Sequence, residues 1–416
     1  MSAIPSRPAF RVRLSVVAAA MLSAAGMAHD VSAATPLNTV HPSFTLHSLR
    51  PGNFRPDVGG MAFLSDGRLV VGSWGGTRNA CCPSGQIGGR QYTGKVYVLS
   101  GVAGATPNVG VDTIASGLED VMGLTVVNDV IYVSGGNQIL RLNRSGNTGP
   151  VTSIDTIFIL PGTPQTTGPA AGDSLRPVKG RSEWMYGLLA RNDTFFVNPS
   201  SMYNGSNLTQ VNPFRGRHLA VTPGNGTTNK RGSFVTRATG FRHHTGLTFG
   251  PEGTIWTNET QGHWVPTNKL IALKNGAHYG YRHSGAGADT SWNSLPETPA
   301  AVFLPQEGGG GSGTMNASGV FSNSPGAPLY LTQGPYAGQI LMGDVSWGGI
   351  QRFFVEKVNG EWQGAGFVWM GGLESGVYRM AQGADGDIYL GMLGATGDWS
   401  WNGQFFGLQK LRYTGT

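Results

Sequence analysis

The sequence predicts an all-β fold, a six-bladed β-propeller with long loops over one face, and three observations lead to this prediction. First, the chain contains 66 glycines while charged residues make up only 12% of it, a composition that suits many short strands joined by tight turns. Second, one two-strand template recurs along the chain. Third, the copies of this template have a nearly constant spacing, which is typical of propeller blades.

The template consists of a glycine, an alternating apolar strand, a turn with Asp, Asn or Gly, and a second apolar strand. In its clearest copy, the run Gly246–Phe249 is followed by the turn Pro251-Glu252-Gly253 and the run Thr254–Thr257, which predicts a β-hairpin. The first glycines of the five copies are Gly60, Gly123, Gly187, Gly246 and Gly376.

The intervals between these glycines are 63, 64, 59 and 130 residues. Because the last interval is two periods of 65, we expect a degenerate copy near residue 311, with Gly319-Val320-Phe321 and Gln339–Met342 as its candidate strands. A third β-run closes most units, at Lys95–Leu99, Gln138–Leu142, Lys269–Leu273, Gly349–Val355 and Leu408–Tyr413. The alternative, a solenoid, needs shorter repeats and polar end caps.

Four insertions rich in Gly, Pro, Ser and Asn interrupt the repeat and are interpreted as the loops over one face. They are Thr77–Tyr92, Pro161–Arg181, Pro199–Arg217 and Tyr281–Ser318.

The first residues have the pattern of an export signal. Arg7, Arg11 and Arg13 precede an apolar run from Leu14 to Met27, and Val31-Ser32-Ala33 offers a cleavage site of small residues. The apolar run is too short for a membrane anchor. We therefore expect a signal peptide over residues 1–33 and a propeller domain over 34–416, secreted or periplasmic, without an integral membrane segment. The formal charge of +6 includes no block of Lys or Arg, so no nucleic-acid partner is expected.

Charged and aromatic residues stand just before the repeated glycines. In a propeller the innermost strand of each blade begins at the central channel, so these residues are expected to meet at one mouth and to form a site there. They are Asp57, Glu119, Asp120, Glu183, Trp184, Arg242 and His243, with His244 next in the chain. The alternative is that the carboxylates cap their own loops.

The only two cysteines, Cys81 and Cys82, are adjacent. In an oxidising compartment they can form a vicinal disulfide, a flat and rigid surface for a planar ligand or a sugar. The alternative is a pair of thiols in a loop, and the sequence leaves both open.

The run Gly240–Leu247, with the later Trp256, Glu259, Gln261-Gly262, Asn268 and Gly276–Gly280, resembles the signature blade of the soluble glucose/sorbosone dehydrogenases. That family has the pattern Gly-x-Arg-Asn-x-x-Gly-Leu, then Glu-x-Gly, an Asn, and Gly-x-Asn-Tyr-Gly. The resemblance implies a six-bladed propeller that uses pyrroloquinoline quinone (PQQ) with calcium. It covers about one blade in order, and the repeat extends it over the chain.

Carried over by position, Arg242 is implied as the partner of a quinone carboxylate, a role that suits a planar guanidinium. His243 stands where the family has Asn, and Gln261 lies near the cofactor. The family's base is a His three residues before the glycine of an earlier blade. Here that position holds Asp57, Asp120 or Trp184, so the candidate bases are Asp120 and His243.

The resemblance thus implies an oxidoreductase that acts on a sugar or a related alcohol or aldehyde, as a small molecule or an oligosaccharide. Trp74, Cys81 and Cys82 are expected to line the cofactor cavity. The residues expected to contact substrate are Asp57, Glu119, Glu183, Trp184 and His244.

Two other functions stay open. The carboxylates Asp57, Glu119, Asp120 and Glu183 also suit a calcium-dependent hydrolase of the lactonase type. Alternatively, the propeller binds carbohydrate without catalysis, through aromatic residues such as Trp399 and Trp401 in a loop rich in Gly and Asn.

Overall fold

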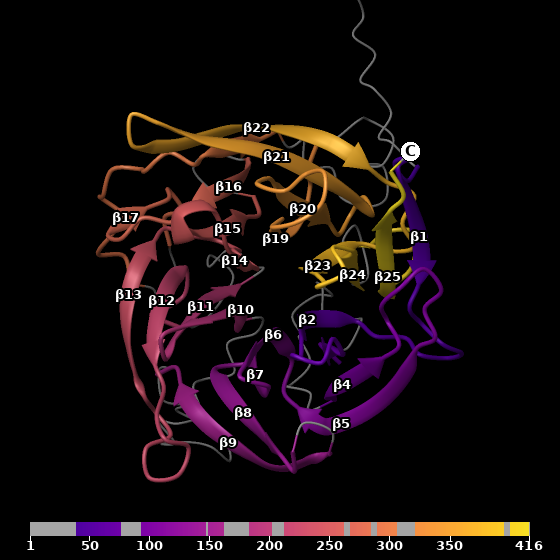
Figure 1. The fold of residues 1–416 in the computed structure, drawn as a ribbon. Helices are drawn as coiled ribbons and strands as arrows, with labels where there is room; N and C mark the ends of the chain where they lie inside the picture. Colours follow the sequence, from indigo (N-terminus) through magenta and orange to yellow (C-terminus); the bar gives the residue numbers. More distant parts are fainter. Residues whose placement is uncertain are drawn as a thin grey trace, which may run out of the picture. The chain divides into compact units, whose positions relative to one another are not determined.

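Six antiparallel sheets follow one another along the chain, and each corresponds to one predicted repeat (Figure 1). The structure is a computed structural model. It describes residues 39–75, 93–146, 149–161, 183–201, 212–261, 267–283, 289–305, 321–394 and 400–415, with Glu183 and Ser201 described by their backbone alone. Pro36–Thr416 form one compact unit. The predicted leader, Cys81 and Cys82, Trp399, all of the insertion Thr77–Tyr92, nearly all of Pro161–Arg181 and about half of each of the other two insertions lie outside the described residues.

The first three sheets cover the N-terminal half of the ring. The first contains β2 (Val58–Phe63), β3 (Leu69–Ser73), β4 (Gly94–Ser100) and β5 (Gly110–Leu118). The second contains β6 (Val121–Val127), β7 (Val130–Gly135), β8 (Gln138–Arg144) and β9 (Val151–Ile159). The third contains β10 (Glu183–Arg191), β11 (Thr194–Ser201), β12 (Arg217–Thr222) and β13 (Ser233–Thr239), with the short parallel strand β17 (Ala277–His278) at its edge.

The other three sheets complete the propeller. The fourth contains β14 (Leu247–Phe249), β15 (Ile255–Glu259), β16 (Asn268–Ala272) and β18 (Val302–Leu304). The fifth contains β19 (Pro325–Tyr330), β20 (Ile340–Asp344), β21 (Gly349–Val358) and β22 (Glu361–Met370). The sixth contains β23 (Val377–Gln382), β24 (Ile388–Leu393), β25 (Phe406–Tyr413) and β1 (Phe44–Ser48). The predicted all-β, six-bladed architecture is confirmed.

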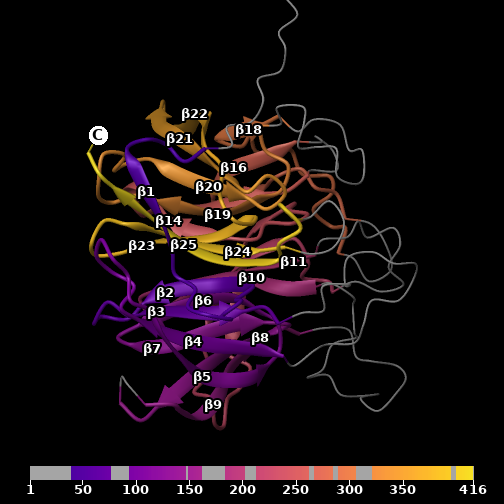
Figure 2. The same cartoon turned by 90° about the vertical axis from the view of Figure 1, so that its right-hand side faces the viewer.

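The sixth sheet joins the two ends of the described chain. Its outermost strand β1 pairs with β25 in antiparallel register, from Phe44 opposite Tyr413 to Ser48 opposite Gln409 (Figure 2). The N-terminal strand therefore closes the ring by completing the C-terminal blade. The other sheets are built from consecutive parts of the chain, except that β17, which follows β16 in the sequence, is added to the third sheet.

The repeated glycines lie where the innermost strands of neighbouring sheets approach each other most closely. A Cβ at Gly123 would lie 2.6 Å from the carbonyl oxygen of Gly187, and a Cβ at Gly246 would lie 2.1 Å from the Cβ of Ala327. Because no side chain fits in these places, the fold requires glycine at the start of the inner strand. The strands behind them pack apolar side chains between the sheets, among them Val70, Val121 and Val133.

The predicted hairpin after Gly246 is confirmed as β14 and β15, joined by a short 3-10 turn, η2 (Pro251–Gly253), in which Glu252 has a φ of 54°. The degenerate copy is confirmed only in part. Its second strand is β20, as expected, but its inner strand is β19 and not the segment that ends at Phe321. Pro325 and Pro328 hid this strand, because proline in a strand argues against it except at a sheet edge, and β19 is an edge strand.

Within the described residues, no helix has the length and apolar character needed to cross a membrane.

Candidate functional site

Side chains from all six sheets meet where the innermost strands begin. We call the following buried residues the channel cluster: Trp74, Met122, Trp184, Tyr186, Val345, Tyr378 and Leu393. His243, just before β14, adds the fourth sheet, because its ring lies 5.1 Å from the ring of Tyr186. Residues that are far apart in the sequence therefore share one site, as the repeat predicted.

A continuous series of contacts joins the predicted residues of this site. The rings of Trp74 and Trp184 are 6.2 Å apart and nearly perpendicular, and the rings of Trp184 and Tyr186 are 5.9 Å apart. The indole Nε1 of Trp184 donates a hydrogen bond of 2.8 Å to Oδ2 of Asp120. Trp74, Asp120, Trp184 and His243 are thus brought together. Tyr186 and Tyr378 belong to the same cluster and were not predicted.

Asp120 is held in an unusual backbone conformation directly before β6. Its φ is 37°, and its side chain is buried. Residues that are forced into this region are often found at functional sites, where the surrounding structure stabilises the strain. Here the hydrogen bond from Trp184 fixes the carboxylate toward the channel cluster.

His243 is buried beside the channel cluster. Burial holds the pKa of its imidazole well below the usual value, and the nearby charges of Arg242 and Arg379 lower it further. The ring is therefore neutral near pH 7 and has the form that accepts a proton.

Glu259, at the end of β15, holds the loop that carries Arg242 and His243. Its two carboxylate oxygens accept the backbone N–H groups of Arg242 at 2.8 Å and of His243 at 2.7 Å. Burial raises the pKa of this carboxyl to about 7, although the two backbone hydrogen bonds and Lys269 act in the opposite direction. The sequence contained Glu259 as part of the family pattern but gave no role for it.

We expect Glu259→Ala to lower the free energy of unfolding by about 3 kcal/mol, because it leaves two backbone N–H groups in the interior without an acceptor. Urea unfolding at pH 7 measures this. The control is Glu252→Ala in the exposed turn, where the carboxylate meets Lys357 at 2.7 Å at the surface and where the expected change is below about 0.5 kcal/mol. Equal losses in both variants would show that Glu259 does not hold the loop.

Arg242, next to His243 in the chain, is half-buried. Its NH1 group donates to the carbonyl oxygen of Thr260 at 2.9 Å, and burial lowers its pKa while Glu259 and Tyr281 act against this. Gln261 lies in the next loop, after β15, with a φ of 54°, and its backbone N–H donates to Oδ1 of Asn268 at 2.7 Å. The hydrogen bond from Arg242 to Thr260 brings the two loops that carry the predicted cofactor-binding residues together.

His244 is placed in the core and not at the mouth, which corrects its expected role in contacting substrate. Its ring stacks on Phe241 at 4.2 Å, its Nε2 atom hydrogen-bonds the carbonyl oxygen of Arg217, and it has no exposed surface. Burial lowers its pKa to about 3. Adjacent residues of an extended segment point in opposite directions, so His243 and His244 cannot both face the channel cluster.

Asp57 has the geometry of loop capping. Asp57 accepts hydrogen bonds from the hydroxyl of Ser73 and from the backbone N–H of Gly75, so it joins the start of β2 to the end of β3. The carboxylate of Glu119 lies against Gly136, where a Cβ would come within 2.6 Å of it. The alternative interpretation, a carboxylate that caps its own loop, is therefore favoured for Asp57. The side chain of Glu183 lies outside the described residues.

Arg379 lies beneath the channel cluster and is buried. Its Nε donates to the carbonyl oxygen of Gly59 at 2.8 Å, its NH2 group donates to that of Met122 at 2.7 Å, and its guanidinium stacks on the Tyr378 ring at 4.0 Å. No carboxylate of the described residues forms an ion pair with it. Arg379 therefore links the sixth sheet to the first and second, and places a positive charge under the site.

Among the described residues, no three His, Cys, Asp or Glu side chains lie close enough together to bind a metal ion.

Solved structures with this fold include sugar dehydrogenases. An oxidoreductase described as a glucose dehydrogenase from Thermus thermophilus has 16% sequence identity and a TM-score of 0.55, over 89% of this chain and 100% of that one. The PQQ domain of a pyranose dehydrogenase from Coprinopsis cinerea has 11% identity and a TM-score of 0.56, over 91% and 97%. The PQQ-bound aldose sugar dehydrogenase from Streptomyces coelicolor has 15% identity and a TM-score of 0.53, over 91% and 99%.

These similarities establish the shared six-bladed fold. No protein-family model matches the sequence, and no curated protein matches it.

Proposed function

We propose that this chain is a secreted or periplasmic oxidoreductase that uses PQQ to oxidise a sugar or a related alcohol or aldehyde. The observation that supports this proposal is the convergence of Trp74, Asp120, Trp184 and His243 at the start of the innermost strands. It occurs on a fold whose solved examples include PQQ-bound sugar dehydrogenases.

The residues of the site fit a flat, anionic cofactor. PQQ is planar and carries three carboxylates, and the channel cluster offers aromatic rings together with the nearby cations Arg242 and Arg379. The indole Nε1 of Trp74 is buried and has no hydrogen-bond partner among the described residues. Such a donor is rare in a folded protein, and an oxygen atom of a bound group would satisfy it.

The carboxylate of Asp57 is already engaged by Ser73 and Gly75, so its charge opposes an anionic cofactor less than that of an unbound carboxylate would. For calcium, the described residues offer no ligand group, and the proposal assigns the ion no position.

In this proposal the quinone, when bound, supplies the electron acceptor for the oxidation. The chain's own residues hold the substrate and move its proton. Neutral His243 is positioned to take the proton of a sugar hydroxyl, and Asp120 is the second candidate for this role. The hydrogen bond from Trp184 to Oδ2 of Asp120 stabilises the carboxylate and makes it a weaker base, which favours His243. Trp74 and Trp184 exclude water from the site, as their burial indicates.

Titration of the mature chain (residues 34–416) with PQQ, with and without Ca²⁺, tests the proposal by the quenching of tryptophan fluorescence and by dye reduction with aldoses. We expect Arg242→Ala to weaken quinone binding by at least about tenfold, because it removes a charge-assisted partner of a carboxylate. Arg231→Ala, in the exposed turn between β12 and β13, is the control and should not change the affinity. Unchanged affinity in Arg242→Ala would contradict the proposed site.

The two alternatives have different results in the same experiment. Lactone hydrolysis that needs calcium but no quinone would indicate the hydrolase. Retention on an insoluble glycan, without either activity, would indicate a binding module.

A further inference from the structure

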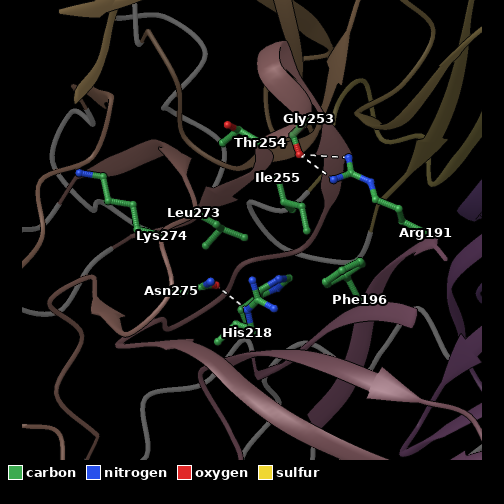
Figure 3. A pocket seen from close by; sticks show the side chains of 10 residues that line it. Arg191, Phe196, His218, Gly253, Thr254, Ile255, Leu273, Lys274 and Asn275 are labelled. Atoms are coloured by element: carbon green, nitrogen blue, oxygen red, sulfur yellow. Dashed lines mark hydrogen bonds between the residues drawn. The ribbon is translucent and has the colours of Figure 1, made fainter. Parts of the chain in front are cut away.

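A second candidate site lies between the third and fourth sheets and is lined by none of the residues of the channel cluster. There the end of β10, the η2 turn and the segment after β16 surround a cavity of about 210 Å³ (Figure 3). Its lining includes three cationic side chains, Arg191, Arg237 and Lys274, the imidazole of His218, and the apolar side chains of Phe196 and Leu273.

His218 presents a hydrogen-bond acceptor to this cavity, and the surrounding contacts fix which nitrogen it is. The amide Nδ2 of Asn198 is oriented by two acceptors, the carbonyl oxygen of His244 and the hydroxyl of Thr257, each at 3.2 Å. The hydroxyl of Thr257 must act as an acceptor for Asn198, because it donates its own hydrogen to the carbonyl oxygen of Gly246 at 2.6 Å. Oδ1 of Asn198 is therefore the atom that faces Nδ1 of His218, at 2.8 Å.

Because an amide oxygen can only accept, Nδ1 of His218 carries the proton and Nε2 carries a lone pair. His218 is 2% exposed, its ring is stacked on Phe196, and Nε2 has no partner among the described residues. Burial and the charge of Arg237 lower the pKa of this imidazole to about 3, so the lone pair is retained at neutral pH. A buried acceptor that borders a cavity requires a donor from whatever fills the cavity.

The charges around the cavity are positive and largely uncompensated. Arg191 donates twice to the carbonyl oxygen of Gly253 and stacks on Phe249, and Nε of Arg237 donates to Oδ1 of Asn275 at 2.5 Å. Neither guanidinium forms an ion pair with a carboxylate of the described residues. Lys274 alone has such a partner, Glu361, whose side chain is 69% exposed. The lining residues include no carboxylate.

We propose that this cavity binds a small hydroxy acid, with its carboxylate between Arg191 and Arg237 and a hydroxyl that donates to Nε2 of His218. The guanidiniums select an anion, since a planar guanidinium matches a carboxylate. The acceptor at His218 selects a donor, and among positive side chains a neutral hydroxyl is favoured over an ammonium group. Phe196, Ile255 and Leu273 cover the carbon chain.

The size of the cavity supports a small ligand, since 210 Å³ corresponds to about seven water molecules in the liquid. The proposal does not depend on the dehydrogenase activity, because none of the residues that line this cavity belongs to the proposed quinone site.

Three probes with six carbon atoms separate the features of the ligand. Gluconate has both a carboxylate and hydroxyls, sorbitol has only the hydroxyls, and hexanoate has only the carboxylate. We expect titration calorimetry of the full chain to show binding of gluconate, at least about tenfold weaker binding of hexanoate, and none of sorbitol up to about 10 mM.

Arg237→Gln should weaken gluconate binding by at least about tenfold, while Lys230→Gln, on the exposed β12–β13 turn, should not change it. His218→Phe, which keeps a ring against Phe196, should reduce the preference for gluconate over hexanoate. Circular dichroism shows whether each variant is folded. If His218→Phe is not folded, the comparison of gluconate binding by Arg237→Gln and Lys230→Gln tests the proposed site.

The proposal is overturned if gluconate does not bind to the wild-type chain, if hexanoate binds equally well, or if Arg237→Gln binds gluconate unchanged. Loss of dye reduction in the PQQ experiment, with gluconate still bound here, would contradict the proposed function alone.

Discussion

Acidification below pH 6.5 is expected to destabilise this protein steeply, because several histidines are buried in the folded state and cannot take up a proton there. Burial lowers the pKa of His218, His244 and His283 from 6.5 to about 3, and that of His278 to about 4. Between these values and 6.5 the unfolded chain binds more protons than the folded one. Stability therefore rises with pH up to about 6.5 and is lost as the pH falls.

The expected slope is about 1.4 kcal/mol per pH unit for each such histidine. Two buried carboxyls act in the opposite direction. The pKa of Glu259 is raised from 4.5 to about 7, and burial also raises the pKa of Asp344. The folded state binds these two protons more tightly than the unfolded chain does, so the contribution of the two carboxyls to the free energy of unfolding falls as the pH rises. Because the histidines outnumber them, the net slope stays positive between about pH 4.5 and 6.5.

Urea unfolding at a series of pH values from 7.5 to 4.5 measures this slope. His283→Gln is the informative variant, because a Gln amide can still donate to the carbonyl oxygen of Phe241, which Nε2 of His283 contacts at 2.9 Å, but it does not titrate. We expect this variant to reduce the slope by about one proton. A wild-type stability that is constant over this range, or a slope that His283→Gln leaves unchanged, would show that His283 is protonated in the folded state.

Arg379→Met is expected to lower the free energy of unfolding by about 3–5 kcal/mol, because it removes the partner of buried groups from three sheets at once. The carbonyl oxygens of Gly59 and Met122 lose a charged donor, and the ring of Tyr378 loses its cation contact. The Met side chain is apolar and nearly as long as the apolar part of the Arg side chain. The loss of stability therefore comes mainly from the missing hydrogen bonds and only slightly from a cavity.

Chemical unfolding of Arg379→Met and Arg412→Met at pH 7 measures the effect. Arg412 also belongs to the sixth sheet, but its side chain is 36% exposed where it meets Asp387 at 3.2 Å. Its replacement should cost at most about 1 kcal/mol. A comparable loss in the two variants would mean that Arg379 is no more than a peripheral contact. Because Arg379 also lowers the pKa of His243, we further expect the imidazole of His243 to titrate at a higher pH in Arg379→Met.

The fold was predictable because the glycines that allow the innermost strands to pack closely recur at regular intervals in the sequence. The close approach of the innermost strands requires Gly60, Gly123, Gly187, Gly246 and Gly376, and this requirement is visible as a regular spacing. The fifth sheet was missed in part because its equivalent glycine, Gly326, lies between two prolines. A Cβ there would come within 2.7 Å of the carbonyl oxygen of Val377, but proline at a strand edge gives no periodic signal.

The site was predictable in its position but not in all its members. Inner strands change register close to the repeated glycine, between Val121 and Gly123 in β6, and just after Gly376, between Val377 and Arg379, in β23. Such a bulge re-aims the following side chains, so the alternation of a regular strand no longer tells which residues face the channel. For this reason Tyr186 and Tyr378 were missed, and His244 was assigned to the mouth although its neighbour His243 is the one that reaches it.

Because β1 pairs with β25, the propeller can close only after the C-terminal strand has been synthesised. β1 is made near the beginning of synthesis, and among the described strands it pairs with β25 alone, so it stays unpaired until Phe406–Tyr413 has left the ribosome. Until then β1 and the open edge of the sixth sheet are both exposed to other chains.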